Sequence, residues 1–344
     1  MNAVMTAYSR EEILAKRQYT RKDLIGAGIL LLLLSCTFYI NFFLPVKDGV
    51  ERLKLHQEVL ANQALAAYQY QMYIHDQIME VVFQAMPQQS DHWFALTYML
   101  YYGTGLVIFL LVLFRFCSRI ADTSSALVAC LYLVAVLPIF WYDNYYHPGD
   151  PWGALLAVLL VQCVLLGYRN WRYYGLLLLS GFVWEKCVLL PFSVAVADYL
   201  QGERPRRTIA KQFAVALLCA VIGQILLRLL LGTNRGWAGT TLAYNISKLY
   251  MYVWGMAVVF GLPIWYTLRC PQKIPLILRA LVAQFPVWLA IYLVFNGVIK
   301  EMRSILVMVS YTWPILALAM QDWLLSDSTM PVQPTPGLPA GSES

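Results

Sequence analysis

The chain has 344 residues, of which 60% are hydrophobic and only 13% are charged, and its formal net charge at pH 7 is +6. Several apolar runs reach the roughly 20 residues that a helix needs to cross a bilayer, so the composition excludes a soluble globular domain and predicts an all-α polytopic membrane protein. The positive charge does not indicate nucleic-acid binding, because membrane proteins concentrate Lys and Arg in their cytoplasmic loops.

Residues 1–23 are rich in Lys and Arg, which predicts a cytoplasmic N-terminus. The first apolar run contains LLLLSC and is typical of an uncleaved signal anchor, because many more spans follow it. The segment 24–325 is predicted to form a single transmembrane domain, and the Pro-, Gly- and Ser-rich segment 326–344 a disordered cytoplasmic tail. The eight predicted full spans are 24–45, 95–115, 123–141, 151–167, 210–231, 247–268, 276–298 and 304–324.

The first outer loop, 46–94, contains long apolar-periodic stretches that predict two amphipathic helices lying at the membrane interface. Asp48 follows the first span within a few residues, and Glu51 is one helical turn further on. A carboxylate at this place can remove a proton from a hydroxyl acceptor, or hold a divalent cation that binds a diphosphate. Helix capping by Asp48, with Glu51 in the first turn, is the alternative explanation.

The second outer loop, WYDNYYHPGDP, holds Asp143 and His147 among several tyrosines. These two side chains can bind a sugar or a cation, whereas a hydrated aromatic belt at the interface is the alternative. Asp150 directly precedes Pro151 and is therefore predicted to be the N-cap of the next span.

Later outer loops carry cations, contrary to the usual preference of basic residues for the cytoplasmic side. Arg235 lies in the third loop, and FNGVIKEMRS in the fourth contains Glu301 and Arg303 shortly before the last span. A lipid phosphate or diphosphate would explain these cations, because arginine binds phosphate oxygens in a bidentate manner. Arg303 is the strongest single candidate for phosphate binding, and Glu301 is a candidate for substrate binding. A solvated charged loop is the alternative.

From 173 to 197 the chain carries no charge except Glu185 and Lys186, which stand in FVWEKCVLLP. A charge at the centre of a bilayer costs about 2.5–3.5 kcal/mol, so such residues are candidates for a functional site. If 173–200 enters the membrane and returns, both charges lie at its tip in a cavity open to the outside. This return also keeps the basic stretch GERPRRTIAK in the cytoplasm, which favours a re-entrant or broken helical hairpin. A neutralised Glu–Lys pair within an ordinary span is the alternative.

The sequence gives little support to metal or disulfide chemistry. The seven cysteines form no CxxC pair, so we predict neither disulfides nor a cysteine metal site. The histidines His56, His75, His92 and His147 all fall on the predicted outer face without the spacing of zinc ligands. A divalent cation beside the outer carboxylates is the one cofactor that the sequence does not exclude.

Two stretches of the chain are similar to the membrane glycosyltransferases of the C-type fold. They are HPGDPWGALLAVLLVQCVLLGYRNWRYYGLLLLSGFVWEKCVLLP, with a Lys/Glu motif before Leu-Leu-Pro, and KEMRSILVMVSYTWP, with an acidic-x-Arg segment. The resemblance covers about 24–325 and implies a short, divergent bacterial member that uses a sugar linked to polyprenyl phosphate. It places the catalytic acid at Asp48, with Glu51 as the second acid, and lipid-phosphate contacts at Lys186 and Arg303.

We therefore expect a multi-pass protein of the cytoplasmic (inner) membrane, with both termini in the cytoplasm, that transfers a sugar to an acceptor on the outer face. Asp48 would remove the acceptor's proton, while Lys186, Arg303 and Arg235 would stabilise the phosphate leaving group. The expected partners are the polyprenyl-phosphate-linked sugar, membrane lipids and polysaccharide-assembly proteins, but no nucleic acid. Two alternatives stay open: a transporter or flippase for a lipid-linked glycan, and a non-catalytic subunit of a polysaccharide-assembly system.

Overall fold

The computed structural model describes residues 21–38, 49–61, 70–140, 149–183, 185–231, 249–291, 306 and 308–328. This part of the chain consists of helices and connecting turns without a strand, which confirms the all-α prediction for it. The helices are α2 (Arg21–Phe38), α3 (Gly49–Leu60), α4 (Tyr70–Gln84), α5 (Asp91–Ile120), α6 (Thr123–Phe140), α7 (Asp150–Leu165), α8 (Trp171–Val183), α9 (Leu190–Gln201), α10 (Arg206–Leu231), α12 (Leu249–Arg269), α13 (Leu276–Ala283), α14 (Phe285–Ile291) and α15 (Val309–Ser328), with 3-10 turns η3 (Glu185–Leu189) and η4 (Pro271–Lys273).

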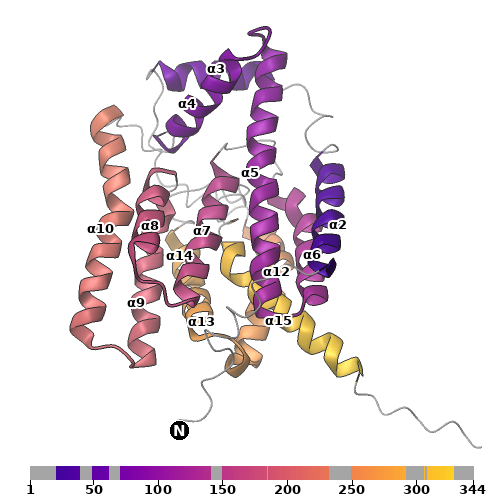
Figure 1. Ribbon diagram of the computed structural model, residues 1–344, viewed down its shortest axis with the longest axis vertical. Coiled ribbons are helices and arrows are strands. Elements are labelled where there is room, and N and C mark those ends of the chain that lie inside the picture. The colour runs from indigo at the N-terminus through magenta and orange to yellow at the C-terminus, as the bar shows by residue number, and fades with distance from the viewer. Residues whose placement is uncertain are drawn as a thin grey trace, which may run out of the picture.

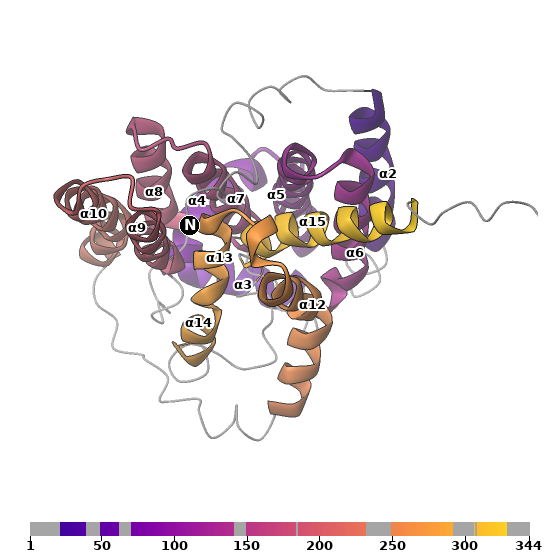
Figure 2. The ribbon, with the colours of Figure 1, turned by 90° about the horizontal axis from the view of Figure 1, so that it is seen from below.

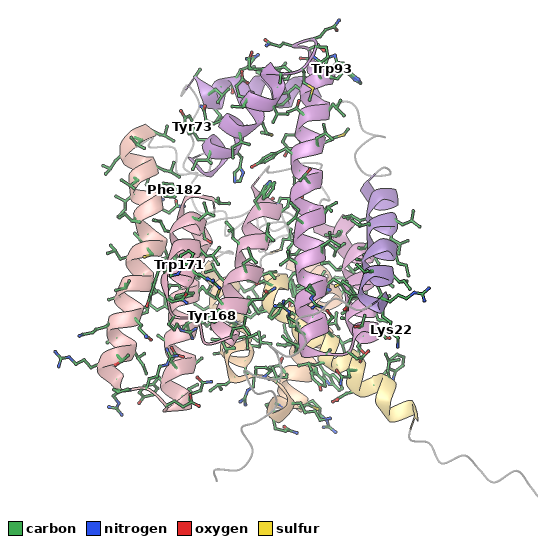
Figure 3. The ribbon with its side chains drawn as sticks, viewed as in Figure 1. Lys22, Tyr73, Trp93, Tyr168, Trp171 and Phe182 are labelled. Atoms are coloured by element: carbon green, nitrogen blue, oxygen red, sulfur yellow. The ribbon has the colours of Figure 1, made fainter. Side chains whose placement is uncertain are left out.

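The longer helices stand side by side, and α3 and α4 lie across one end of the bundle (Figure 1). Seen along the bundle, α8, α9 and α10 form a group on one side, and α2, α5 and α6 lie on the other (Figure 2). We call the end covered by α3 and α4 the cap end and the opposite one the basal end. In Figure 3 the cap end is marked by Tyr73 and Trp93, and the basal end by Lys22 and Tyr168.

The apolar core runs through the middle of the bundle. α5 packs against α6, α7 and α15, and the buried indole of Trp313 on α15 donates a hydrogen bond to the carbonyl of Ala129 on α6 at 2.8 Å. This bond satisfies the one polar group of a large buried aromatic side chain, so the Trp313 indole can lie inside the bundle with its donor paired.

Two of the described helices, α5 and α10, are long and apolar enough to cross a membrane. The core helix of a soluble protein buries most of its apolar surface, but the most apolar window of α10 is only 22% buried. Leu229 and Leu230 near its end are 74% and 77% exposed. Apolar surface of this extent is characteristic of a helix that faces lipid or a partner, which indicates an association with a membrane.

The other described helices are shorter than the spans that the sequence predicts, and two spans of sufficient length are fewer than eight. α7 has 16 residues and is about 24 Å long at 1.5 Å per residue, below the roughly 30 Å of a hydrocarbon core. The prediction of one continuous helix over 276–298 is wrong, because the chain breaks at Gln284 between α13 and α14. Pro286 explains the break, since it has no amide hydrogen and its ring clashes with the carbonyl four residues earlier.

The segment 173–200 is broken and doubles back. α8 ends at Val183 and packs against α4, which lies at the cap end. On α9, Asp198 has returned to the level of Arg169, which precedes α8, and their side chains lie 3.2 Å apart. α8 and α9 therefore run in opposite directions, and the connection 202–205 lies at the basal end.

α8 and α10 approach each other closely where two glycines face each other. A Cβ on Gly223 would lie 2.8 Å from the backbone carbon of Gly181. The side-chain amide of Gln224 donates a hydrogen bond to the Gly181 carbonyl across the same seam. Side chains at either glycine would force the helices apart, so this seam fixes α8 and the turn that follows it.

Candidate functional site at the cap end

Most residues that the sequence singles out lie outside the described part of the chain. They are Asp48, Asp143, His147, Arg235, Glu301 and Arg303. For Glu51, in the first turn of α3, and for Glu185 and Lys186, at the start of η3, the structure describes the backbone alone. The roles of all these residues stay predictions. Their described neighbours show that α3 and the start of η3 both belong to the cap end.

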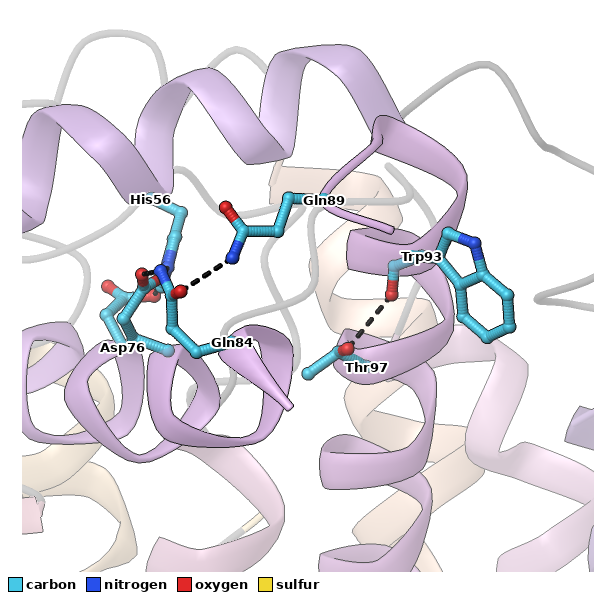
Figure 4. Close-up of polar contacts among 7 residues, drawn as sticks. His56, Asp76, Gln84, Gln89, Trp93 and Thr97 are labelled. Carbon is cyan, nitrogen blue, oxygen red and sulfur yellow. Dashed lines mark hydrogen bonds and ion pairs between the residues drawn. The ribbon is translucent and has the colours of Figure 1, made fainter. Parts of the chain in front are cut away.

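A histidine held between two carboxylates is the central feature of the cap end (Figure 4). His56 of α3 places Nδ1 2.9 Å from Oδ1 of Asp76 and Nε2 2.7 Å from Oε2 of Glu80, both on α4. Asp76 and Glu80 are four residues apart and therefore share one face of that helix. The side chains of His56 and Asp76 are each 2% exposed, whereas that of Glu80 is 27% exposed. We call these three residues the His56 cluster.

Neighbouring side chains fix the His56 cluster from two directions. The ring of Phe94, in the first turn of α5, lies 4.6 Å from the His56 ring between centroids. Gln84 donates a hydrogen bond to the second oxygen of Glu80, and Gln89 donates one to the Gln84 carbonyl at 2.6 Å (Figure 4). The second oxygen of Asp76 is buried and has no hydrogen-bond partner among the described residues.

The geometry of the His56 cluster fixes how many protons it holds. Each of the two nitrogen–oxygen contacts needs one hydrogen between its atoms, but a neutral imidazole carries one and an ionised carboxylate carries none. A neutral imidazole and two ionised carboxylates have one hydrogen for these two contacts. The cluster must therefore hold one more proton than that. Either His56 is an imidazolium, or one of the two carboxyl groups is protonated.

The electrostatics of the cluster locate the extra proton. Burial lowers the pKa of His56, but its hydrogen bonds with Asp76 and Glu80 outweigh burial and raise that pKa above 6.5. Burial raises the pKa of Asp76. Burial also acts to raise the pKa of Glu80, but hydrogen bonds from Gln84 and His56 outweigh it and lower that pKa. Glu80 therefore stays ionised, and the proton lies between His56 and Asp76.

A second histidine joins the same layer to the bundle. Nδ1 of His75 lies 2.7 Å from the hydroxyl of Tyr101 on α5. The Tyr101 ring in turn lies 5.4 Å from the ring of Trp152 on α7. Burial lowers the pKa of His75 to about 4, so this imidazole is neutral at pH 7. The cap end thus contains a neutral buried His75 and a buried His56 that shares the extra proton of its cluster with Asp76.

The described residues contain no group of three His, Cys, Asp or Glu side chains that could hold a metal ion. In the His56 cluster the two ring nitrogens point in opposite directions, and each one meets a different carboxylate. The three groups therefore do not converge on a common point, as the ligands of one ion must. The divalent cation that the sequence leaves open stays a prediction for the loops outside the described residues.

Sequence reasoning missed the His56 cluster because it searched the histidines for metal-ligand spacing. A signal for it was present in the two amphipathic helices. Asp76 and Glu80 lie on the same stripe of α4 as the buried Met79 and Phe83, and His56 lies one turn before the buried Val59 on α3. Polar residues on the buried stripe of a helix need partners, which is a reason to search for partners on the neighbouring helix.

The basal end contains a different kind of ionic contact. Arg115 on α5 lies 3.2 Å from Asp23 on α2, and Asp23 also accepts a hydrogen bond from Thr123 at 3.0 Å. Asp198 contacts both Arg169, at 3.2 Å, and Arg204, at 3.6 Å. The basic residues that the sequence assigns to the cytoplasm thus gather, where they are described, at the end opposite to the His56 cluster.

No family model matches the chain, and neither a curated protein nor a solved structure shows significant similarity to it. Its function is therefore inferred from its own residues and their geometry.

Proposed function

We propose that this chain is a membrane glycosyltransferase of the C-type fold, which moves a sugar from a polyprenyl-phosphate carrier to an acceptor at the cap end. The observation that carries this proposal is the meeting of the α3–α4 layer, which contains a buried acid–base cluster, with the tip of the broken α8–α9 segment. α4 packs there against α8, which ends at Val183, three residues before Lys186. A carboxylate-rich layer thus lies beside a cation-bearing turn, as sugar transfer from a phosphate requires.

In the proposed arrangement the cap end faces the outside of the inner membrane and the basal end faces the cytoplasm, together with both termini. The arginines of the basal end support this orientation, because cytoplasmic loops are rich in Lys and Arg. α8, η3 and α9 enter the membrane and return, while the remaining long helices and the α13–α14 pair form the eight crossings. Helices as short as α7 would need a locally thinner bilayer or flanking residues to complete the crossing.

The proposed reaction assigns a role to each predicted residue. Asp48 removes the proton of the acceptor hydroxyl, whose oxygen attacks the anomeric carbon while the bond from that carbon to the phosphate oxygen breaks. Glu51 assists as the second acid. Negative charge develops on the departing phosphate, which Lys186, Arg303 and Arg235 stabilise. The residues Asp143, His147, Glu185 and Glu301 bind the substrates.

A transporter for a lipid-linked glycan is the second candidate, and the broken helix is the observation that favours it. Discontinuous helices form the central binding sites of many transporters. A non-catalytic subunit of a polysaccharide-assembly system is the third candidate. The three candidates differ in what the purified chain does by itself.

The test uses the full chain in lipid nanodiscs and vesicles, with a panel of radiolabelled sugars linked to polyprenyl phosphate. We expect transfer by the unaltered chain, and a rate that is about 10²–10⁴-fold lower in Asp48→Asn, the usual effect of removing a general base. Lys186→Met should also lose transfer, whereas Lys54→Met, on the exposed side of α3, should retain it. Absence of transfer with every donor would contradict the proposal. Movement of the intact donor across the vesicle membrane would support the transporter instead.

A further inference from the structure

α3 is a short helix whose position depends on its contacts with the rest of the protein. It has 12 residues, a length at which an isolated helix is marginal in water. Among its described side chains, Val59 packs with Tyr73 of α4 and Leu231 of α10, and the His56 ring lies tilted against the Phe94 ring of α5. The two hydrogen bonds of His56 attach α3 to α4 through polar side chains.

We propose that His56 is a positioning residue, which as an imidazolium between Asp76 and Glu80 fixes α3 and the carboxylates at its start against α4 and α5. This inference rests on the proposed function, because that function gives Asp48 and Glu51 their catalytic roles. Glu51 lies in the first turn of α3, and Asp48 immediately precedes that helix. Movement of α3 would displace the backbone of Glu51.

The attachment depends on the extra proton of the His56 cluster. When that proton is present, Nδ1 and Nε2 both donate, and both carboxylates accept. When it leaves, one ring nitrogen carries a lone pair that faces a carboxylate oxygen at the same short distance. A hydrogen bond is then replaced by a repulsive contact in a buried place, where water cannot relieve it.

The groups around His56 favour the imidazolium. α4 contributes the two carboxylates and the neutral His75, while α5 contributes the ring of Phe94. Among the described residues, other charged or titratable groups at the cap end are exposed or paired: Asp91 and His92 of α5, Arg228 of α10, Lys54 with Glu58, which lie 3.9 Å apart on α3 itself, and the Tyr101 hydroxyl, which pairs with His75. No described cation therefore competes with His56 for Asp76 or Glu80.

The sign of the pH dependence follows from these contacts. The folded pKa of His56 lies above 6.5, so its contribution is fully present below pH 6.5 and is lost as the pH rises through the folded value. Glu80 acts in the opposite direction at acidic pH, because its folded pKa is lowered and its contribution is lost as the pH falls through that value. α3 is thus held most firmly at pH values between the folded pKa of Glu80 and the folded pKa of His56.

Hydrogen exchange of the full chain in nanodiscs, without any substrate, tests the inference. The amides of 53–61 are followed by mass spectrometry from pH 5.5 to 9, after correction for the intrinsic pH dependence of exchange. We expect protection of α3 to fall about 10- to 150-fold as His56 loses its proton, which corresponds to the loss of one hydrogen bond to a charged group. A protection that is constant across this range would overturn the proposal.

Asp76→Asn is the decisive variant, because it retains the shape of the cluster but removes the need for the extra proton. The amide of Asn donates to Nδ1, and a neutral His56 still donates from Nε2 to Glu80. We expect α3 to remain protected and the pH step to disappear, whereas His56→Ala should leave α3 unprotected at every pH. His92→Gln, at an exposed position on α5, is the matched control and should retain the step.

The exchange experiment separates the two proposals. If the unaltered chain transfers no sugar but shows the step and its loss in Asp76→Asn, the proposed function fails and the attachment by His56 stands. If the chain transfers sugar, Asp76→Asn should shift the alkaline limit of its activity profile to higher pH. A pH step that survives in Asp76→Asn would overturn the role of His56, whatever the activity.

Discussion

The cap end and the basal end of the bundle are both held by buried ionic contacts, but the cations differ. At the cap end an imidazole lies between two carboxylates, 2.9 and 2.7 Å from their oxygens. At the basal end guanidinium groups meet carboxylates, with Arg115 and Arg169 each 3.2 Å from an aspartate. Arginine keeps its charge at every pH a protein survives, whereas histidine titrates close to neutrality.

The two kinds of contact also join different parts of the fold. The basal contacts connect long helices and their loops: α2 with α5, and the start of α8 with the end of α9. The His56 cluster connects the short α3 to α4, in a layer that lies across the bundle. The comparison indicates that the ionic contacts between the long helices keep their charges at every pH, while the attachment of α3 depends on a proton.

The largest expected effect comes from removing a buried arginine of the basal end. Arg169 and Asp198 are each 7% exposed, so Arg169→Met leaves a carboxylate buried with only Arg204 near it. Removal of one partner of a buried ion pair costs about 3–5 kcal/mol in the free energy of unfolding. Thermal denaturation in detergent should show this loss at pH 6 and equally at pH 9. Arg206→Met, at an exposed position, is the control and should change little.

The second-largest effect concerns the pH-dependent attachment of α3 by His56. Raising the pH through the folded pKa of His56, which lies above its ordinary value, should weaken the attachment of α3 by about 1.5–3 kcal/mol, the contribution of a hydrogen bond to a charged group. Limited proteolysis can compare the two ends directly. Cleavage within 53–61 should accelerate with pH after correction for protease activity, while cleavage within 202–205 should not. Equal acceleration at both sites would remove the distinction between the ends.

A smaller effect tests the close approach of α8 and α10 at Gly181 and Gly223. Gly223→Ala places a Cβ 2.8 Å from the backbone of Gly181, and overpacking of this kind costs about 1–3 kcal/mol. Gly175→Ala on α8 is the matched control, because nothing lies within 4 Å of a Cβ there. That substitution should be neutral or stabilising by up to about 1 kcal/mol. Thermal denaturation of the two variants at one pH measures the difference, and similar stabilities would argue against the close approach.

The smallest effect concerns an exposed contact of the basal end. Lys273 lies 2.6 Å from Asp322, but its side chain is 52% exposed, and Asp322 also accepts a hydrogen bond from Tyr266. Exposed ion pairs contribute about 0–1 kcal/mol, so Lys273→Met should hardly change the unfolding temperature. A loss as large as that of Arg169→Met would show that burial does not distinguish these contacts.

The sequence predicts the helices of this protein better than it predicts their lengths or contacts. Apolar runs indicate α5 and α10, and the charges of Glu185 and Lys186 before Pro191 indicate where the 173–200 segment breaks. Apolar content does not reveal the division at Pro286, because the residues on both sides of it are equally hydrophobic. Two of the described helices are long and apolar enough to cross a membrane, fewer than the eight spans that apolar content predicts.

The contacts of the candidate site depend on tertiary structure and could not be predicted from spacing. His56 and Asp76 belong to different helices, and their meeting depends on how α3 packs against α4. Charge and family resemblance drew attention instead to loop residues such as Asp48 and Arg303, because isolated charges near spans are conspicuous. A search for polar residues on the buried stripes of α3 and α4 would have identified the cluster.

The account depends on the cap end and the basal end facing opposite sides of a membrane. Single cysteines at Gln88, in the loop between α4 and α5, and at Glu203, in the loop between α9 and α10, test this directly, because both positions are exposed. They are introduced into a chain without its native cysteines, and intact cells are treated with a maleimide that cannot cross membranes. We predict labelling of Gln88→Cys in intact cells and of Glu203→Cys only after the membrane is permeabilised. Labelling of both positions from the same side would contradict the account.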